Sequence, residues 1–87
     1  MKRKRGIMTS TEDLLLYVKP GCPYCAKVLR YLQEARINIE TRNVFEGSNL
    51  EDLLRIGGKN QAPCLIIDGK ALYESEDIIT FLKKHVV

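Results

Sequence analysis

Two cysteines separated by two residues stand where a short apolar run gives way to a helical pattern, and this junction constrains the fold more than any other feature. The run, residues 14–18, is short and continuous, which is typical of a strand buried on both faces. After a Pro-Gly pair, apolar residues recur from Pro23 onward at three- and four-residue steps. The repeat predicts an amphipathic helix that opens with a proline, so Cys22 and Cys25 lie where a buried strand meets a helix. The apolar positions of this helix are Ala26, Val28, Leu29, Leu32 and Ala35.

A second strand and a second helix follow. Residues 39–44 alternate apolar and polar side chains, which predicts a strand. Ser48 or Asn49 is placed to cap the next helix, and the glycine pair at 57–58 ends it. The apolar residues of that helix are Leu50, Leu53, Leu54 and Ile56.

The last part of the chain predicts a hairpin and a final helix. Residues 64–67 form another buried strand, and Asp68-Gly69 is a two-residue turn that returns the chain through residues 71–73. Ser75 then caps an apolar-faced helix. The order is βαβαββα, which predicts an α/β fold. Its first βαβ unit should be parallel and right-handed, and helices should cover both faces of a four-stranded mixed sheet.

The net charge of +3 resides at the N-terminus. Lys2, Arg3, Lys4 and Arg5 are four of the 14 basic residues, so the other 10 are nearly balanced by 11 acidic ones. No aromatic residues interleave with this basic tetrad, which argues against nucleic-acid binding. We expect residues 1–12 to be a flexible basic arm and residues 13–87 to be one domain.

Apolar segments and cysteine usage indicate a compartment. The apolar run after Glu12 and Asp13 is too short for a signal peptide, and no run approaches the roughly 18 residues that a membrane-spanning helix needs. Three cysteines, two of them closely spaced, point to redox chemistry or metal binding and away from a disulfide framework. We therefore expect a cytoplasmic protein without a membrane partner.

The strand-to-helix position predicts different chemistry for the two cysteines. A cysteine attacks a disulfide only as its thiolate. Unpaired N–H groups and the dipole at the helix start favour the Cys22 anion, and Lys19 stands nearby to add its charge. Cys25 lies one turn deeper, within reach of Cys22. We expect Cys22 to be the attacking thiol and Cys25 the resolving thiol.

Zinc binding is the alternative that the spacing leaves open. Tetrahedral zinc needs four ligands, and Cys64 and His85 are the other cysteine and histidine of the chain. Both fall inside regular elements and do not form a second pair of closely spaced ligands. We expect no metal.

From Leu14 onward the chain resembles the dithiol glutaredoxins, a family with a thioredoxin-like fold. The tetrad Cys22-Pro23-Tyr24-Cys25 matches the family's active site, and Lys19 matches a lysine that contacts the glycine carboxylate of glutathione. Gln61-Ala62-Pro63 corresponds to the family's Thr-Val-Pro segment, whose proline is cis. Residues 73–78 correspond to the segment that holds the γ-glutamyl end.

The resemblance implies a glutathione site around Cys22. The backbone of Ala62 would pair with the cysteinyl part, and the N-terminus of the last helix at Ser75 would receive the γ-glutamyl carboxylate. Glu76 or Asp77 would take the ammonium group. The implied glutathione-binding residues are Lys19, Tyr24, Gln61, Ala62, Pro63, Ser75, Glu76 and Asp77.

Some residues depart from the family pattern. Tyr73-Glu74 replaces the usual paired glycines, and the resulting Glu-Ser pair is similar to the γ-glutamyl site of glutathione transferases. Arg55 is a candidate for the second-helix residue that helps to hold the glycine carboxylate. Cys64 follows the cis-proline position, either as a small apolar residue of a buried strand or as a third thiol open to glutathionylation.

The resemblance implies a monomeric, glutathione-dependent enzyme that reduces protein disulfides and glutathione mixed disulfides. Its partners would be glutathione and the disulfide-containing or glutathionylated proteins. One alternative within the family is an iron–sulfur cluster carrier, against which the proline of the tetrad argues. A second alternative, outside this family, is a glutathione-transferase-like binding domain, against which Cys25 argues. A third is an oxidoreductase that thioredoxin reductase reduces, and Lys19 and the Ser75 segment favour glutathione instead.

Overall fold

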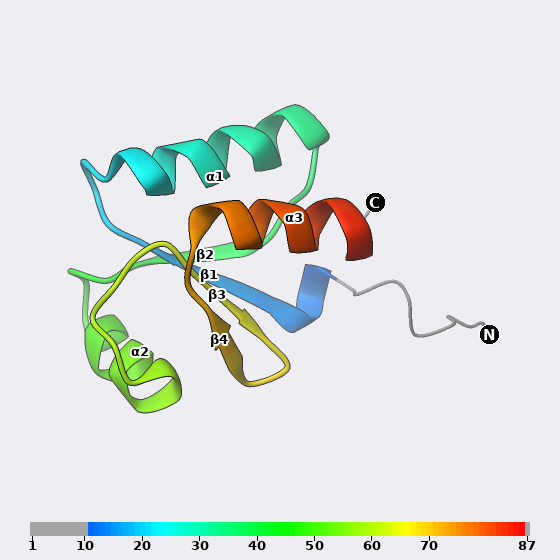
Figure 1. Cartoon of the computed structure of the whole chain (residues 1–87). Coiled ribbons are helices and arrows are strands. Elements are labelled where there is room, and N and C mark those ends of the chain that lie inside the picture. The colour runs from blue at the N-terminus through cyan, green and yellow to red at the C-terminus, as the bar shows by residue number, and fades with distance from the viewer. Residues whose placement is uncertain (1–10, 87) are drawn as a thin grey trace.

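A four-stranded mixed sheet forms the centre of the molecule (Figure 1). The computed structural model describes residues 11–86. The strands stand in the order β2-β1-β3-β4. Strand β1 pairs with β2 in parallel and with β3 antiparallel, and β4 pairs antiparallel with β3, as the sequence predicts. The strands are β1 (Leu14–Val18), β2 (Glu40–Asn43), β3 (Cys64–Ile67) and β4 (Lys70–Leu72).

Helices cover both faces of the sheet. Helices α1 (Pro23–Ala35) and α3 (Ser75–His85) lie side by side over one face, and α2 (Asn49–Gly57) lies on the other (Figure 1). A short 3-10 turn, η1 (Thr11–Asp13), precedes β1. The expected basic arm therefore lies outside the described residues, except for Thr11 and Glu12, which belong to this turn. The βαβαββα order is confirmed.

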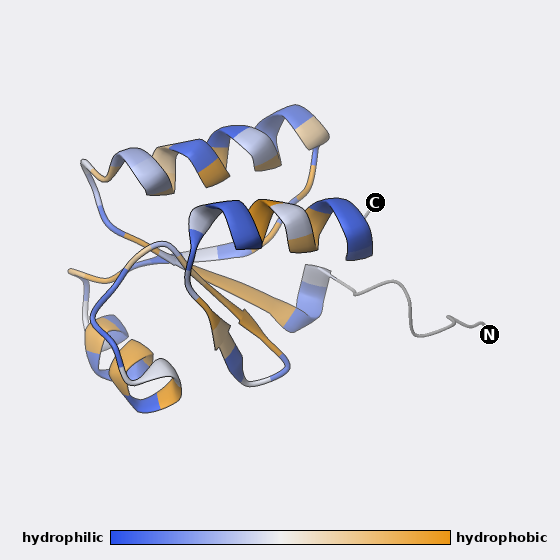
Figure 2. Cartoon of the chain, in the orientation of Figure 1, coloured by the Kyte–Doolittle hydropathy of each residue, from blue (hydrophilic) through white to orange (hydrophobic). Residues whose placement is uncertain are grey.

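The hydrophobic core has one part on each side of the sheet, and Figure 2 shows the apolar central strands between the helices. Strand β1 alternates between the two parts, because successive side chains of a strand point to opposite faces. Leu16 faces α1 and α3, whereas Tyr17 faces α2. Fully buried residues of the first part include Leu16, Val28, Leu65, Ile78 and Leu82, and those of the second part include Tyr17, Leu53 and Cys64.

The apolar stripe predicted for α1 is wider than the buried one. Cys25, Val28 and Leu32 are buried, whereas Leu29 is 38% exposed and Ala26 and Ala35 are also exposed. The three buried residues are spaced by three and four positions and so follow one line along the helix. The other apolar residues stand to the sides of this line, where the sheet does not reach them.

The helix starts differ in part from the prediction. Ser75 is the first residue of α3 and not its cap, because Glu74 holds the N-cap position without a side-chain capping bond. Ser48 holds the N-cap position of α2 as expected, but its side chain makes no capping bond either. Asp68 and Gly69 have φ values of 51° and 81°, which confirms a hairpin turn with two left-handed residues.

Candidate active site

Cys22 stands at the N-terminus of α1, and its sulfur takes the place of a capping side chain. Its backbone is extended, with φ −91° and ψ 116°, and Pro23 follows as the first helical residue. The N–H of Cys25 donates a hydrogen bond to Cys22 Sγ over 3.2 Å. This bond satisfies one of the donors that a first helical turn leaves unpaired. The positive end of the helix dipole is thereby directed at the sulfur.

These surroundings lower the pKa of the Cys22 thiol below its ordinary value of 9.0. Partial burial is the largest single influence and acts in the opposite direction. It is outweighed by hydrogen bonds from the Cys25 thiol and from the N–H groups of Cys25 and Tyr24, together with the charge of Lys19. Cys22 is therefore the thiol that ionises more readily, and the thiolate is the nucleophilic form.

Cys25 has the opposite character. Its side chain is only 1% exposed, and the N–H of Lys19 donates to its sulfur over 3.5 Å. Burial, followed by the hydrogen bond and the charge of Cys22, raises the pKa of Cys25 to about 11. Both residues are free thiols. A thiol that ionises readily thus lies beside one that stays protonated.

The segment that follows α2 reaches the tetrad. The Ala62–Pro63 peptide bond is cis, as the resemblance implies, and Pro63 is buried. The Cys22 thiol donates to the Ala62 carbonyl oxygen, with the sulfur and oxygen 3.7 Å apart. The main chain of Ala62 therefore borders the Cys22 sulfur.

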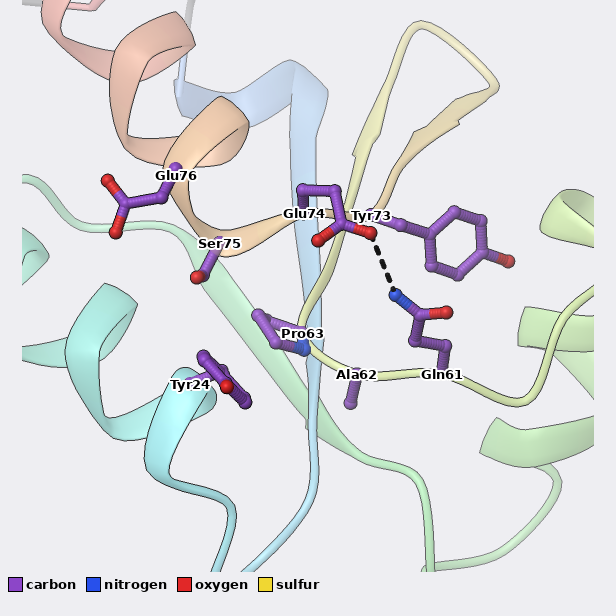
Figure 3. Close-up of a pocket in the computed structure, with 8 residues that line it drawn as sticks. All are labelled: Tyr24, Gln61, Ala62, Pro63, Tyr73, Glu74, Ser75 and Glu76. Atoms are coloured by element: carbon purple, nitrogen blue, oxygen red, sulfur yellow. Dashed lines mark hydrogen bonds between the residues drawn. The ribbon is translucent and has the colours of Figure 1, made fainter.

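A groove of about 430 Å³ opens beside the tetrad (Figure 3). Residues 61–63 form one wall, residues 73–76 form the other, and the ring of Tyr24 lines it from the first turn of α1. Tyr24 is 65% exposed, so its ring is available to a ligand. The groove thus brings together six of the eight residues predicted to bind glutathione.

The first turn of α3 supplies the polar groups of the second wall. Figure 3 shows the Ser75 hydroxyl pointing toward the side of the groove that Tyr24 and Pro63 bound. The Glu74 carboxylate turns toward Gln61, whose amide donates to it over 3.5 Å. Backbone N–H groups of a first helical turn are free to bind a carboxylate. This wall therefore offers both an anion site and a carboxylate.

The acidic residues of this turn do not all share the groove. Glu76 lines it and forms an ion pair with Lys27 of α1. Asp77 is exposed and is not among the lining residues, whereas Glu74 and Tyr73 are. Neither Glu74 nor Tyr73 was among the predicted ligands. The Glu-Ser pair was the sequence signal that pointed to Glu74.

Lys19 does not line this groove. It lines a second groove, of about 210 Å³, together with Cys22 and Cys25. Cys22 therefore lines the groove that has a lysine, and its sulfur contacts Ala62, which lines the groove that has two carboxylates. Arg55 lines neither groove, and its guanidinium pairs with Asp52 over 2.7 Å.

Residues 16–86 match the family described as glutathione S-transferase, N-terminal domain. The chain belongs to this family. Among curated proteins, this glutathione S-transferase N-terminal domain is similar to the hybrid peroxiredoxin hyPrx5 of Haemophilus influenzae, with 27% identity over 67 residues. The match covers 77% of the chain but only 28% of that relative, so the chain spans less than a third of its length.

Solved structures share the fold of the domain. Glutathione transferase Omega 3C from Trametes versicolor superposes with a TM-score of 0.70 and 30% identity, over 83% of this chain and 33% of that one. A buckwheat glutaredoxin, solved in a glutathione complex, gives a TM-score of 0.65 over 84% of this chain and 70% of that one. Its 19% identity bears on the fold alone. The expected thioredoxin-like fold is confirmed, and at the level of class these relatives support a thiol oxidoreductase.

The third thiol of the domain belongs to the core. Cys64 is 0% exposed, and burial raises its pKa to about 11, although hydrogen bonds from the Tyr73 side chain and the Leu72 backbone act in the other direction. The sequence left two alternatives for Cys64, a small apolar residue of a buried strand and a third thiol open to glutathionylation. Its burial supports the first. Within residues 11–86, no group of three or more His, Cys, Asp or Glu side chains is arranged to hold a metal ion. None of the helices described is long and apolar enough to cross a membrane.

Proposed function

We propose that this domain catalyses glutathione-dependent thiol–disulfide exchange in the manner of a dithiol glutaredoxin. The observation that carries the proposal is the environment of Cys22. This thiol has a lowered pKa, caps a helix and lies 3.7 Å from the Ala62 carbonyl oxygen at the border of a groove. Disulfide exchange needs a thiolate with open access on one side, and this environment supplies both.

The first branch uses Cys22 alone. Its thiolate attacks the glutathionyl sulfur of a mixed disulfide, a Cys22–glutathione disulfide forms, and the former partner leaves as a thiolate that takes a proton from water. The thiolate of a second glutathione attacks the glutathionyl sulfur on Cys22. Oxidised glutathione leaves, and Cys22 returns as the thiolate.

The second branch requires Cys25. Cys22 attacks a protein disulfide and forms a mixed disulfide with the protein. The Cys22 sulfur thereby loses its negative charge. Two of the influences that raise the Cys25 pKa, the hydrogen bond and the charge of Cys22, then disappear. Cys25 ionises more readily at that stage and displaces the reduced protein, leaving a Cys22–Cys25 disulfide that two glutathione molecules reduce.

The two grooves suit the two ends of glutathione. The first turn of α3 at Ser75 would receive the γ-glutamyl carboxylate, and Glu74 or Glu76 its ammonium group. The Ala62 backbone would pair with the cysteinyl part, like an added strand. Lys19, in the second groove, would attract the glycine carboxylate. Glutathione would thereby lie across Cys22.

Turnover of a glutathionylated peptide tests the proposal, with glutathione and glutathione reductase recycling the enzyme. We expect the wild type and Cys64→Ala to be active and Cys22→Ser to be inactive. Cys25→Ser should still release glutathione from the peptide but should no longer reduce a protein disulfide. Full activity in Cys22→Ser would exclude the proposed reaction.

A glutathione transferase activity is the second candidate, favoured by the family match and by the Glu74-Ser75 pair in the groove. A transferase would conjugate glutathione to an electrophile such as chlorodinitrobenzene without forming a disulfide on Cys22. Conjugation by Cys22→Ser, together with no reduction of mixed disulfides by the wild type, would favour this candidate.

We also propose that the protein acts in the cytoplasm as a monomer. A reducing compartment keeps thiols such as Cys22 and Cys25 in the free form that the reaction requires. Gel filtration of the reduced protein and cell fractionation test these two statements.

A further inference from the structure

Tyr73 joins the two walls of the first groove. Its hydroxyl accepts a hydrogen bond from the N–H of Lys59 and donates one to the Lys59 carbonyl oxygen, each over 3.2 Å. The Lys59 ammonium also lies 5.1 Å from the centre of the ring, in cation–π contact. Lys59 belongs to the loop that leads from α2 to residues 61–63, whereas Tyr73 precedes Glu74 and Ser75. The Tyr73 side chain thus connects the loop that precedes the wall of residues 61–63 to the beginning of the wall of residues 73–76.

Gly57 leaves room for this phenol. An ideal Cβ on Gly57 would overlap with the Tyr73 hydroxyl, and it would lie 2.9 Å from Tyr73 Cζ and 3.0 Å from the Cβ of Ala71. The glycine is not needed for its backbone, because it is not among the residues with positive φ. The end of α2 therefore lacks a side chain at the point where the phenol passes.

The other contact between the walls is weaker. The Gln61 amide and the Glu74 carboxylate are 3.5 Å apart and exposed, which is long for a hydrogen bond between side chains. In Figure 3 the Tyr73 ring points away from Ser75 and Pro63, so its hydroxyl faces the α2 loop and not the ligand space. Tyr73 also makes no hydrogen bond to Cys22.

We propose that Tyr73 is a positioning residue that sets the spacing between the Ala62 main chain and the first turn of α3, and hence the affinity of the groove. The identity of the ligand, a glutathionyl group, rests on the proposed function. The Tyr73–Lys59 linkage acts on ligand binding and leaves the reactivity of Cys22 unchanged.

Tyr73→Phe removes both hydrogen bonds to Lys59, together with the contact between the hydroxyl and the Cys64 thiol, and keeps the ring. We expect the KM for a glutathionylated peptide to rise about fivefold, because losing roughly 1 kcal/mol of linkage would leave the groove at its binding-competent spacing in only about a fifth of the molecules. The kcat and the pH profile of Cys22 alkylation should stay as in the wild type. Tyr31→Phe is the matched control, since Tyr31 lies on α1 with its ring near Lys83 and lines no part of this groove. Equal KM values for Tyr73→Phe, Tyr31→Phe and the wild type would overturn the proposal.

Gly57→Ala tests the same linkage from the side of α2. The added methyl group would displace the phenol, so KM should rise as in Tyr73→Phe. In the double variant Gly57→Ala/Tyr73→Phe, the two increases in KM should be less than additive. The phenylalanine lacks the hydroxyl with which the added methyl group would overlap most. Full additivity would show that Gly57 acts independently of Tyr73. If Gly57→Ala does not fold, Tyr73→Phe alone decides.

A readout without ligand separates this inference from the proposed function. The amide resonance of Ala62 should shift in Tyr73→Phe and stay in place in Tyr31→Phe. If the wild type fails to reduce glutathione mixed disulfides, the proposed function is wrong, and the Ala62 resonance still decides the linkage. An unchanged Ala62 resonance in Tyr73→Phe would overturn it.

Discussion

The N–H of Cys25 donates a hydrogen bond to Cys22 Sγ over 3.2 Å, so the sulfur that we propose as the nucleophile is also the cap of α1. The reactive atom therefore contributes to the stability of the helix that activates it. Replacement of Cys22 changes two properties at once, and the choice of substituent separates them.

Cys22→Ser should keep the cap, because a serine oxygen accepts the same hydrogen bond. Cys22→Ala should lower the free energy of unfolding by about 1 kcal/mol, the usual cost of a lost cap. Urea denaturation of the two variants measures the difference. Equal stability of the serine and alanine variants would show that the sulfur does not act as a cap.

The lowered pKa of Cys22 predicts how alkylation depends on pH. The rate of reaction with iodoacetamide should reach half its plateau below pH 9.0, the ordinary thiol value, because the thiolate is the reactive form. Lys19→Met should move the midpoint upward, since the charge of Lys19 contributes to the lowered pKa. Lys59→Met, remote from the sulfur, is the control. A midpoint at or above 9.0 in the wild type would contradict this electrostatic account.

The buried thiol of Cys64 predicts a loss of stability in alkali. A group whose pKa is raised by folding stabilises the protein fully below its unfolded pKa, and this contribution is lost as the pH rises to the folded pKa. For Cys64 this window runs from 9.0 to about 11. Across this window the free energy of unfolding of the wild type should fall by about 2 kcal/mol more than that of Cys64→Ala, since each pKa unit corresponds to about 1.4 kcal/mol.

Urea denaturation at several pH values measures, for the wild type and for Cys64→Ala, the slope of the free energy of unfolding against pH. Cys25, whose pKa is also raised to about 11, titrates in the same window in both proteins, and Cys64 itself contributes to the raised pKa of Tyr73, so the difference between the slopes reports on Cys64 together with this neighbour. Identical slopes for the wild type and Cys64→Ala would mean that the thiol ionises in the folded protein without cost.

Much of the fold could be predicted because local signals agreed with one another. The run at 14–18, the proline that opens α1 and the Asp68-Gly69 turn each specify a backbone conformation that the structure contains. The breadth of the α1 stripe could not be predicted, because Leu29 is as apolar as Leu32 and only the position of the sheet decides which is buried.

The candidate site, like the fold, could be predicted only in part from the sequence. Cys22, Cys25 and Pro63 could be placed from the tetrad, the helix start and the resemblance. The contribution of the acidic residues could not, because Glu74, Glu76 and Asp77 are close in sequence and the rotation of the first helical turn decides which of them borders the groove. Tyr73 was missed because its role depends on contacts with Gly57 and Lys59, which no sequence pattern marks.

The difference between the acidic residues predicts unequal effects on glutathione binding. Glu74→Gln should raise the KM for glutathione by about tenfold or more, because a hydrogen bond to a charged group contributes about 1.5 kcal/mol or more. Asp77→Asn should change it less than twofold, since Asp77 does not line the groove. Steady-state kinetics at fixed peptide concentration compares the two. A larger effect at Asp77 would reverse the assignment.

The most direct test of the account is the covalent intermediate on Cys22. Cys25→Ser, incubated with a glutathionylated peptide and quenched in acid, should carry one glutathionyl group, and tandem mass spectrometry should locate it on Cys22. Addition of glutathione should then remove the group and release oxidised glutathione. A modification found on Cys64, or no modification while the peptide is still reduced, would contradict the proposal that Cys22 is the nucleophile.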